Sequence, residues 1–123
     1  MFPFACPGEE APWQKNAFEG YINGDGSSIE EAVIIRIDGL QKCLNESCYD
    51  GEFSRIIEQE HAFLEKSFGV IGQDWRQSGE TNMEVDIEQD DKFYDKVAII
   101  LLSTGQQRIV YFDITQPYKA IKG

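Results

Sequence analysis

The adjacent residues Glu60 and His61 are the first candidates for acid–base chemistry, because a carboxylate and an imidazole can both carry protons near neutral pH. In a helix Glu60 would lie near the centre of an apolar stripe, where an unpaired charge is costly. Its carboxyl group would act as a general acid or base in a pocket or as a structural group bonded to the sheet or a loop, unless the helix is rotated enough to expose it. Helical neighbours point about 100° apart, so Glu60 and His61 do not easily converge on one substrate atom. We therefore predict no catalytic residue and keep both as residues of a candidate pocket.

A dense run of carboxylates could recognise cationic groups without catalysing a reaction. A strand over residues 83–88 would present alternate carboxylates on one face, about 7 Å apart. Such a face either stays solvated and discourages edge pairing, or docks the Lys and Arg side chains of another protein. The candidate partner-binding residues are Glu84, Asp86, Glu88, Asp90, Asp91 and the aromatic Tyr94.

Metal and phosphate sites are not predicted. The segment Asn23-Gly24-Asp25-Gly26 resembles part of a calcium loop, but the EF-hand register would put Tyr21 and Ala32 where carboxylates are needed. No Lys-Ser/Thr pair follows its glycines, so the segment does not match a phosphate-binding loop. Three cysteines and one histidine do not supply zinc ligands at the usual spacing. We predict no metal and no cofactor.

The cysteines and the N-terminus predict a cytoplasmic protein. Cys6, Cys43 and Cys48 are few and odd in number, which favours a reducing compartment and leaves a Cys43–Cys48 link open. The first ten residues lack a basic region and are interrupted by proline and acid before an apolar run reaches signal-peptide length. The longest apolar run, 97–102, is too short to cross a membrane.

The segment 51–69 must position Glu60, because it alone has sustained helical periodicity. Apolar residues recur there at three- and four-residue spacing and predict one amphipathic helix, which Gly69 would end in the left-handed conformation. The stripe consists of Phe53, Ile56, Ile57, Phe63, Leu64 and Phe68.

The sequence pattern predicts mainly strands in the rest of the chain. We expect strands at 32–37, 83–88, 93–102 and 108–114, a further sheet region from Trp75, and turns at 21–28, 89–92 and 103–107. Ser28 and Glu31 predict a single helical turn, and Pro117 is expected to end the last strand. These elements predict an α+β domain over 21–123, with one main helix packed on a mostly antiparallel sheet of about four strands. Residues 1–20 would form an irregular N-terminal arm.

The composition is acidic: 22 acidic and 11 basic side chains give a formal charge of -11 over 123 residues. Such a charge repels nucleic acids and anionic membranes, so we predict neither as a partner. It attracts a basic protein or, alternatively, only keeps the chain soluble. No feature of the sequence predicts the oligomeric state.

A set of short motifs is spread over roughly residues 23–114. The motifs are Gly24-Asp25-Gly26-Ser27-Ser28, Glu30, Ala32-Val33-Ile34-Ile35, Glu60-His61-Ala62-Phe63-Leu64, Phe68-Gly69, Trp75, Tyr94-Asp95 and Tyr111-Phe112-Asp113-Ile114. Together they resemble a group of short, mostly uncharacterised bacterial proteins. Some members of the group resemble small immunity or inhibitor proteins associated with bacterial toxins, so the resemblance implies a toxin-binding role. An aromatic residue is more usual in the group where His61 stands, which argues against a catalytic histidine.

Two functional hypotheses follow from different classes. The first is a non-enzymatic acidic immunity-type inhibitor of a basic bacterial toxin or nuclease. The alternative is a small-ligand-binding or enzymatic domain with a pocket between helix and sheet that contains Glu60. A stand-alone domain with neither role is the third interpretation.

Overall fold

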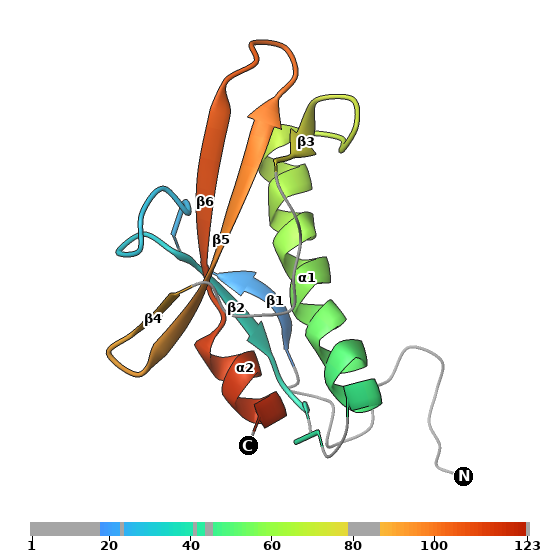
Figure 1. Cartoon of the computed structure of the whole chain (residues 1–123), viewed down its shortest axis with the longest axis vertical. Coiled ribbons are helices and arrows are strands. Elements are labelled where there is room, and N and C mark those ends of the chain that lie inside the picture. The colour runs from blue at the N-terminus through green and yellow to red at the C-terminus, as the bar shows by residue number, and fades with distance from the viewer. Residues whose placement is uncertain (1–17, 23, 41, 44–45, 79–86, 123) are drawn as a thin grey trace, which may run out of the picture.

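The computed structural model describes residues 18–22, 24–40, 42–43, 46–78 and 87–122. This part of the chain forms an α+β domain with two helices and a curled sheet of six strands (Figure 1). The elements in chain order are β1 (Glu19–Ile22), β2 (Val33–Ile37), α1 (Glu46–Phe68), β3 (Trp75–Gln77), β4 (Ile87–Gln89), β5 (Lys92–Leu101), β6 (Gln107–Asp113) and α2 (Thr115–Lys122).

The sheet is mixed but mostly antiparallel. Its strand order is β1-β2-β6-β5-β3, and β4 also pairs with β5. The one parallel pair is β2 with β6, in which Val33 lies opposite Phe112. Strand β5 is the centre of the sheet, because ten residues let it pair with β6 over most of its length and with β3 and β4 at its two ends.

Helix α1 runs beside the sheet, and all residues of the predicted apolar stripe except Ile57 belong to the core or pack against it (Figure 1). Phe53, Ile56 and Leu64 are fully buried, and burial of each side chain contributes about 1.5–3 kcal/mol to folding. Phe63 packs edge-to-face on Phe112 of β6, with ring centroids 5.7 Å apart. The core therefore lies between α1 and one face of the sheet.

The end of α1 is confirmed and its start is earlier than expected. Gly69 has a φ of 105°, and its N–H donates to the carbonyl of Glu65 at 3.0 Å, as a left-handed C-terminal cap requires. The helix begins at Glu46, five residues before the expected start at Gly51. Gly51 is exposed and no other group lies near its Cα, so the helix tolerates it at a cost of about 1 kcal/mol.

Helix α2 was not expected from the sequence. Strand β6 ends at Asp113, whose Oδ1 accepts the N–H of Thr115 at 3.0 Å and so caps the new helix. Pro117 lies in the first turn of α2, where its missing N–H leaves no hydrogen bond unmade. The prediction that Pro117 ends the last strand was therefore wrong, and the expected single main helix becomes two helices.

Strand β1 was also missed, because residues 21–28 were expected to form a turn. Tyr21 lies opposite Ile35 in an antiparallel ladder and packs edge-to-face on Phe63, with centroids 5.4 Å apart. The turn itself is shorter than expected, and Gly24 and Gly26 within it have positive φ. Ser28 Oγ accepts the N–H of Glu31 at 3.2 Å, as the predicted single helical turn requires.

The other strands agree with expectation where they are described. The structure confirms the strand within 32–37, the two long strands β5 and β6, and the turns that precede and join them. Residues 83–86 of the expected alternating strand lie outside the described residues, and β4 covers its end. The sheet thus has six strands instead of about four. Strand β1 begins at Glu19, inside the expected arm 1–20, of which residues 1–17 also lie outside the described residues.

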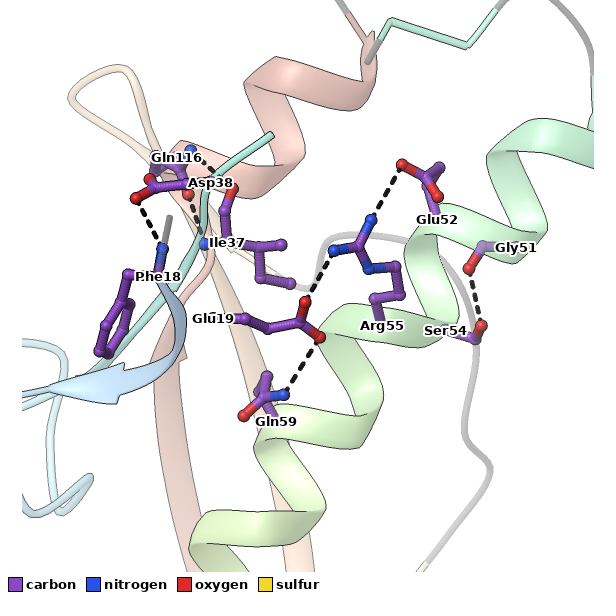
Figure 2. Close-up of polar contacts among 10 residues, drawn as sticks. All are labelled: Phe18, Glu19, Ile37, Asp38, Gly51, Glu52, Ser54, Arg55, Gln59 and Gln116. Atoms are coloured by element: carbon purple, nitrogen blue, oxygen red, sulfur yellow. Dashed lines mark hydrogen bonds and ion pairs between the residues drawn. The ribbon is translucent and has the colours of Figure 1, made fainter. Parts of the chain in front are cut away.

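Polar contacts join β1, β2 and both helices at one end of the sheet (Figure 2). Arg55 of α1 donates to Glu19 of β1 at 2.7 Å, and this ion pair raises the pKa of the guanidinium. Gln116 of α2 accepts the N–H of Ile37 at 2.8 Å and donates to its carbonyl at 3.0 Å. These contacts fix the helices relative to β1 and β2.

Candidate functional site

The turn between β4 and β5 presents the described part of the predicted acidic surface. Asp90 and Asp91 have φ values of 54° and 63°, and Gln89 lies opposite Lys92. Positive φ at both central residues matches the two-residue hairpin turn whose twist fits the flanking strands. Glu88, Asp90 and Asp91 are all exposed. Glu84 and Asp86 lie outside the described residues.

Part of this negative charge is neutralised by a lysine of the same chain. Lys119 of α2 donates to Asp91 Oδ2 at 2.7 Å, and its ammonium group lies 5.9 Å from the ring centroid of Phe93. Asp91 is 83% exposed and Lys119 45% exposed, so the pair contributes about 0–1 kcal/mol to stability. The lysine offsets the charge of Asp91 in the free protein.

Tyr94 is not the exposed aromatic anchor that its position in the sequence suggested. It is 7% exposed, on the first half of β5, opposite Ile87 of β4 and Asp113 of β6. Burial raises the pKa of its hydroxyl, and the carboxylates of Asp113, Asp90 and Glu30 raise it further. Tyr94 is therefore a buried residue whose hydroxyl is subject to the charge of three carboxylates, of which Asp113 lies opposite it on β6.

We call Glu30, Asp90 and Asp113 the acidic cluster. Its members come from the turn before β2, the β4–β5 turn and the end of β6, and all three act on the Tyr94 hydroxyl. Glu30 and Asp90 are exposed, whereas Asp113 is half-buried and caps α2. Exposed carboxylates such as Glu30 and Asp90 can form charge-assisted hydrogen bonds with a Lys or Arg side chain of a partner.

Sequence reasoning found Asp90 but missed Glu30 and Asp113. Asp113 stands opposite Tyr94 in the β5–β6 register, so aligning the two predicted strands across their turn could have found it. Glu30 carried no such signal, because its position depends on the parallel pairing of β2 with β6.

Asp25 supports the turn that holds Glu30. Its Oδ1 accepts both the backbone N–H and the hydroxyl of Ser27, at 2.9 and 2.6 Å, and these bonds lower the pKa of the carboxyl group. Gly26 is buried beneath this turn, and its N–H donates to the carbonyl of Glu31 at 2.7 Å. The described residues of the segment that resembles part of a calcium loop, Gly24 to Gly26, thus belong to a turn closed by hydrogen bonds within the chain.

Glu60 and His61 lie on helix α1, at the positions that helical periodicity predicted. Glu60 is 4% exposed on the core side of α1, and it interacts with other groups of the chain. His61 is half-buried and packs edge-to-face on Trp75, with ring centroids 6.2 Å apart. Asp95 of β5, 7% exposed, is a second buried carboxylate that sequence reasoning missed.

Cys43 is disulfide-bonded, and its partner is not among the described side chains. Its backbone N–H donates to the carbonyl of Ile121 in α2 at 2.8 Å. Disulfides persist mainly in oxidising compartments, so this bond counts against a reducing one, and cytoplasmic localisation stays a prediction.

Metal binding and membrane insertion find no support in the described residues. Among them, no group of three or more His, Cys, Asp and Glu side chains could hold a metal ion. Neither α1 nor α2, as far as the structure describes them, combines the length and apolar character that a membrane crossing needs.

Comparison with protein-family models, with curated proteins and with solved structures gave no match.

Proposed function

We propose that the protein is a non-enzymatic acidic interaction protein, an immunity-type inhibitor that binds a basic bacterial toxin or nuclease. The observation that supports this proposal is the exposed acidic turn between β4 and β5, where Glu88, Asp90 and Asp91 all face solvent. The charges of Glu30, Asp90 and Asp113 also act on the hydroxyl of Tyr94 in the neighbouring strand β5. The formal charge of -11 adds a long-range attraction for a cationic surface.

The local electrostatics favour a cationic side chain at this cluster. A guanidinium 4 Å from a carboxylate near a protein surface gains about 4 kcal/mol of Coulomb energy, before the cost of desolvation. Electrostatic steering can raise association rates from about 10⁵–10⁶ towards 10⁸ M⁻¹s⁻¹ at low salt.

The alternative, an enzymatic or small-ligand pocket at Glu60, has less support. A general acid or base must reach the substrate proton within hydrogen-bond distance. Glu60 is 4% exposed and interacts within the chain, which favours a structural role. Replacement of Glu60 with Gln separates the two, because loss of stability without loss of binding supports the structural role.

The first experiment localises the cationic contact. The double variant Glu30→Gln/Asp90→Asn removes two charges of the cluster, and asparagine tolerates the positive φ of Asp90. The matched control Glu58→Gln/Glu65→Gln removes two exposed carboxylates of α1, so both variants have the same net charge. We expect the cluster variant to bind a lysine decapeptide about tenfold more weakly than the control in calorimetric titrations, a difference of about 1.4 kcal/mol.

The second experiment tests the class of partner. Wild type and both variants are immobilised and exposed at low salt to a lysate of the organism that encodes the protein, and retained proteins are eluted with rising salt. We expect a basic protein that wild type and control retain and the cluster variant does not. Equal retention by all three proteins would contradict the proposal.

A further inference from the structure

Three large aliphatic side chains are exposed together at the end of α1. Val70, Ile71 and Leu102 are 53%, 47% and 40% exposed. Val70 and Ile71 follow α1, and Leu102 begins the turn between β5 and β6; Figure 1 shows the end of α1, β3 and this turn at the same end of the molecule. We call these three residues the aliphatic tip. Adjacent exposed apolar side chains of this kind commonly mark an interaction site.

Asp74 holds the two segments of the tip together. Its Oδ2 accepts the N–H of Val70 at 2.7 Å, and its own N–H donates to the Val70 carbonyl at 2.8 Å. Its carbonyl accepts the N–H of Leu102 at 2.9 Å. Trp75 is fully buried next to this contact and donates to the Gly69 carbonyl at 2.8 Å. The tip is therefore ordered before any partner arrives, which lowers the entropy lost on binding.

An open pocket of about 390 Å³ adjoins the tip. Phe68, Leu101 and Leu102 supply its apolar wall, and serine and glutamine side chains supply most of the rest. Asp74 is the charged residue among those that line it. A pocket of this size accepts one or two side chains of a partner, of which one is apolar and one can be cationic.

The overall charge favours a basic partner over a second copy of the chain. Two copies would each carry a formal charge of -11 and would repel each other at the distance of a shared interface. Asp74 is the charged residue in the lining of the pocket, while Glu65 and Lys66 in the last turn of α1, Arg76 of β3 and Arg108 of β6 are exposed outside the lining. A carboxylate beside an apolar wall matches an apolar side chain that has a Lys or Arg close by.

We infer that the aliphatic tip docks an amphipathic segment of a basic protein. An aliphatic or aromatic side chain of that segment enters the pocket, and a neighbouring Lys or Arg meets the carboxylate of Asp74. The inference rests on the proposed function, since it takes the same basic partner, and it adds an apolar anchor at a separate site. Buried apolar anchors usually dominate binding energy, whereas exposed charge pairs contribute less.

The test uses two synthetic peptides of equal composition. Both contain about 14 residues of leucine and lysine, about half of each; one gathers the leucines on a single helical face, and the other scrambles them. Fluorescence anisotropy measures their binding to wild type, to Val70→Ser/Leu102→Ser and to the control Phe18→Ser/Ile22→Ser. Phe18 and Ile22 are 38% and 39% exposed at the other edge of the sheet, so the control removes two comparable side chains.

We expect wild type and control to bind the amphipathic peptide more tightly than the scrambled one, and the tip variant to lose about tenfold in affinity. That factor corresponds to about 1.4 kcal/mol. Unchanged binding by the tip variant, or equal binding of both peptides, would overturn the inference. So would a dimer in sedimentation velocity at high salt that the tip variant abolishes, because the tip would then bind a second copy.

The variant Glu30→Gln/Asp90→Asn separates this inference from the proposed function. In one outcome, the tip variant loses peptide binding and the acidic-cluster variant binds the lysine decapeptide as wild type does. This result would support docking at the aliphatic tip and contradict cation binding at the acidic cluster. The opposite pattern would keep the proposed function and overturn the inference.

Discussion

Gly26 lies where the turn after β1 passes under β6. Its φ is 79°, its carbonyl accepts the N–H of Tyr111 at 2.8 Å, and an added Cβ would overlap Cγ1 of Val110. Both the backbone conformation and the lack of space therefore require glycine here.

Replacement of Gly26 with alanine is expected to lower the free energy of unfolding by about 3 kcal/mol, because the left-handed conformation and the overpacking each cost about 1–2 kcal/mol. Urea denaturation measures the loss. Gly39→Ala is the control, since its φ is 84° but no atom lies within 4 Å of the added Cβ; it should lose only about 1 kcal/mol. Similar losses in both variants would show that space at Gly26 is not limiting.

Tyr94 makes stability depend on pH in the alkaline range. Burial first, and then the acidic cluster, raise the pKa of its hydroxyl in the folded state. Above the unfolded-state value of about 10, the unfolded chain loses this proton and the folded chain keeps it, so stability falls as pH rises from about 10 towards the folded pKa. Tyr94→Phe should weaken this fall, measured by urea denaturation between pH 8 and pH 11.

Asp90→Asn tests the cause of that effect. It removes one of the charges that raise the Tyr94 pKa, so the last phase of tyrosine ionisation, followed by absorbance, should move to lower pH. An unchanged titration would mean that burial alone shifts Tyr94.

For single residues, sequence patterns predicted the properties that depend on residues nearby in the sequence. Helical periodicity predicted both the burial of Glu60 and the cap at Gly69, because each depends on spacing within one segment. The burial of Tyr94 and the approach of Glu30 could not be predicted, since they depend on which strands become neighbours.

The amide side chain of Gln116 links helix α2 to strand β2. Gln116 makes two hydrogen bonds to the backbone of Ile37, which pairs with β1 on its other edge (Figure 2). Thr115 Oγ1 accepts the N–H of Phe93 at 2.9 Å, so α2 also contacts the start of β5.

Gln116→Ala is expected to destabilise the protein by about 1–3 kcal/mol, because it leaves two partly buried backbone groups of Ile37 without this partner. Hydrogen exchange should show the largest loss of protection at the Ile37 amide. Gln116→Glu is the matched control: its carboxylate can still accept the Ile37 N–H, so protection there should fall less. Equal exchange in both variants would indicate that the side chain does not hold α2.

The elements that sequence analysis missed are short and lack a periodic signal. β1 has four residues, and half of them are Glu19 and Gly20, which disfavour strands. α2 has eight residues and contains Pro117. A proline suggests the end of a strand, but the first turn of a helix also tolerates it. The long elements α1, β5 and β6 were predicted because their patterns extend over several turns or alternations.

The charge of -11 is a property of the whole molecule and should make its stability depend on salt. The described ion pairs of Arg36, Arg55 and Lys119 are all partly exposed, and among the described acidic residues only Glu60 and Asp95 are buried. Repulsion within such a surface destabilises the folded state and is screened as the Debye length shortens.

Raising NaCl from about 20 to about 200 mM should therefore increase the melting temperature by a few degrees. Thermal denaturation followed by circular dichroism measures the change. Glu58→Gln/Glu65→Gln carries two fewer negative charges and should respond less to the same salt. A melting temperature that falls with salt would show that the attractive pairs outweigh the repulsion.

The parallel contact between β2 and β6 has a consequence for synthesis on the ribosome. Val33 finds Phe112, and Ile37 finds Gln116, only across a separation of 79 residues. The edge of β2 that pairs with β6 therefore stays open until β6 has left the exit tunnel. Nascent chains stalled before β6 should be the ones most dependent on chaperones.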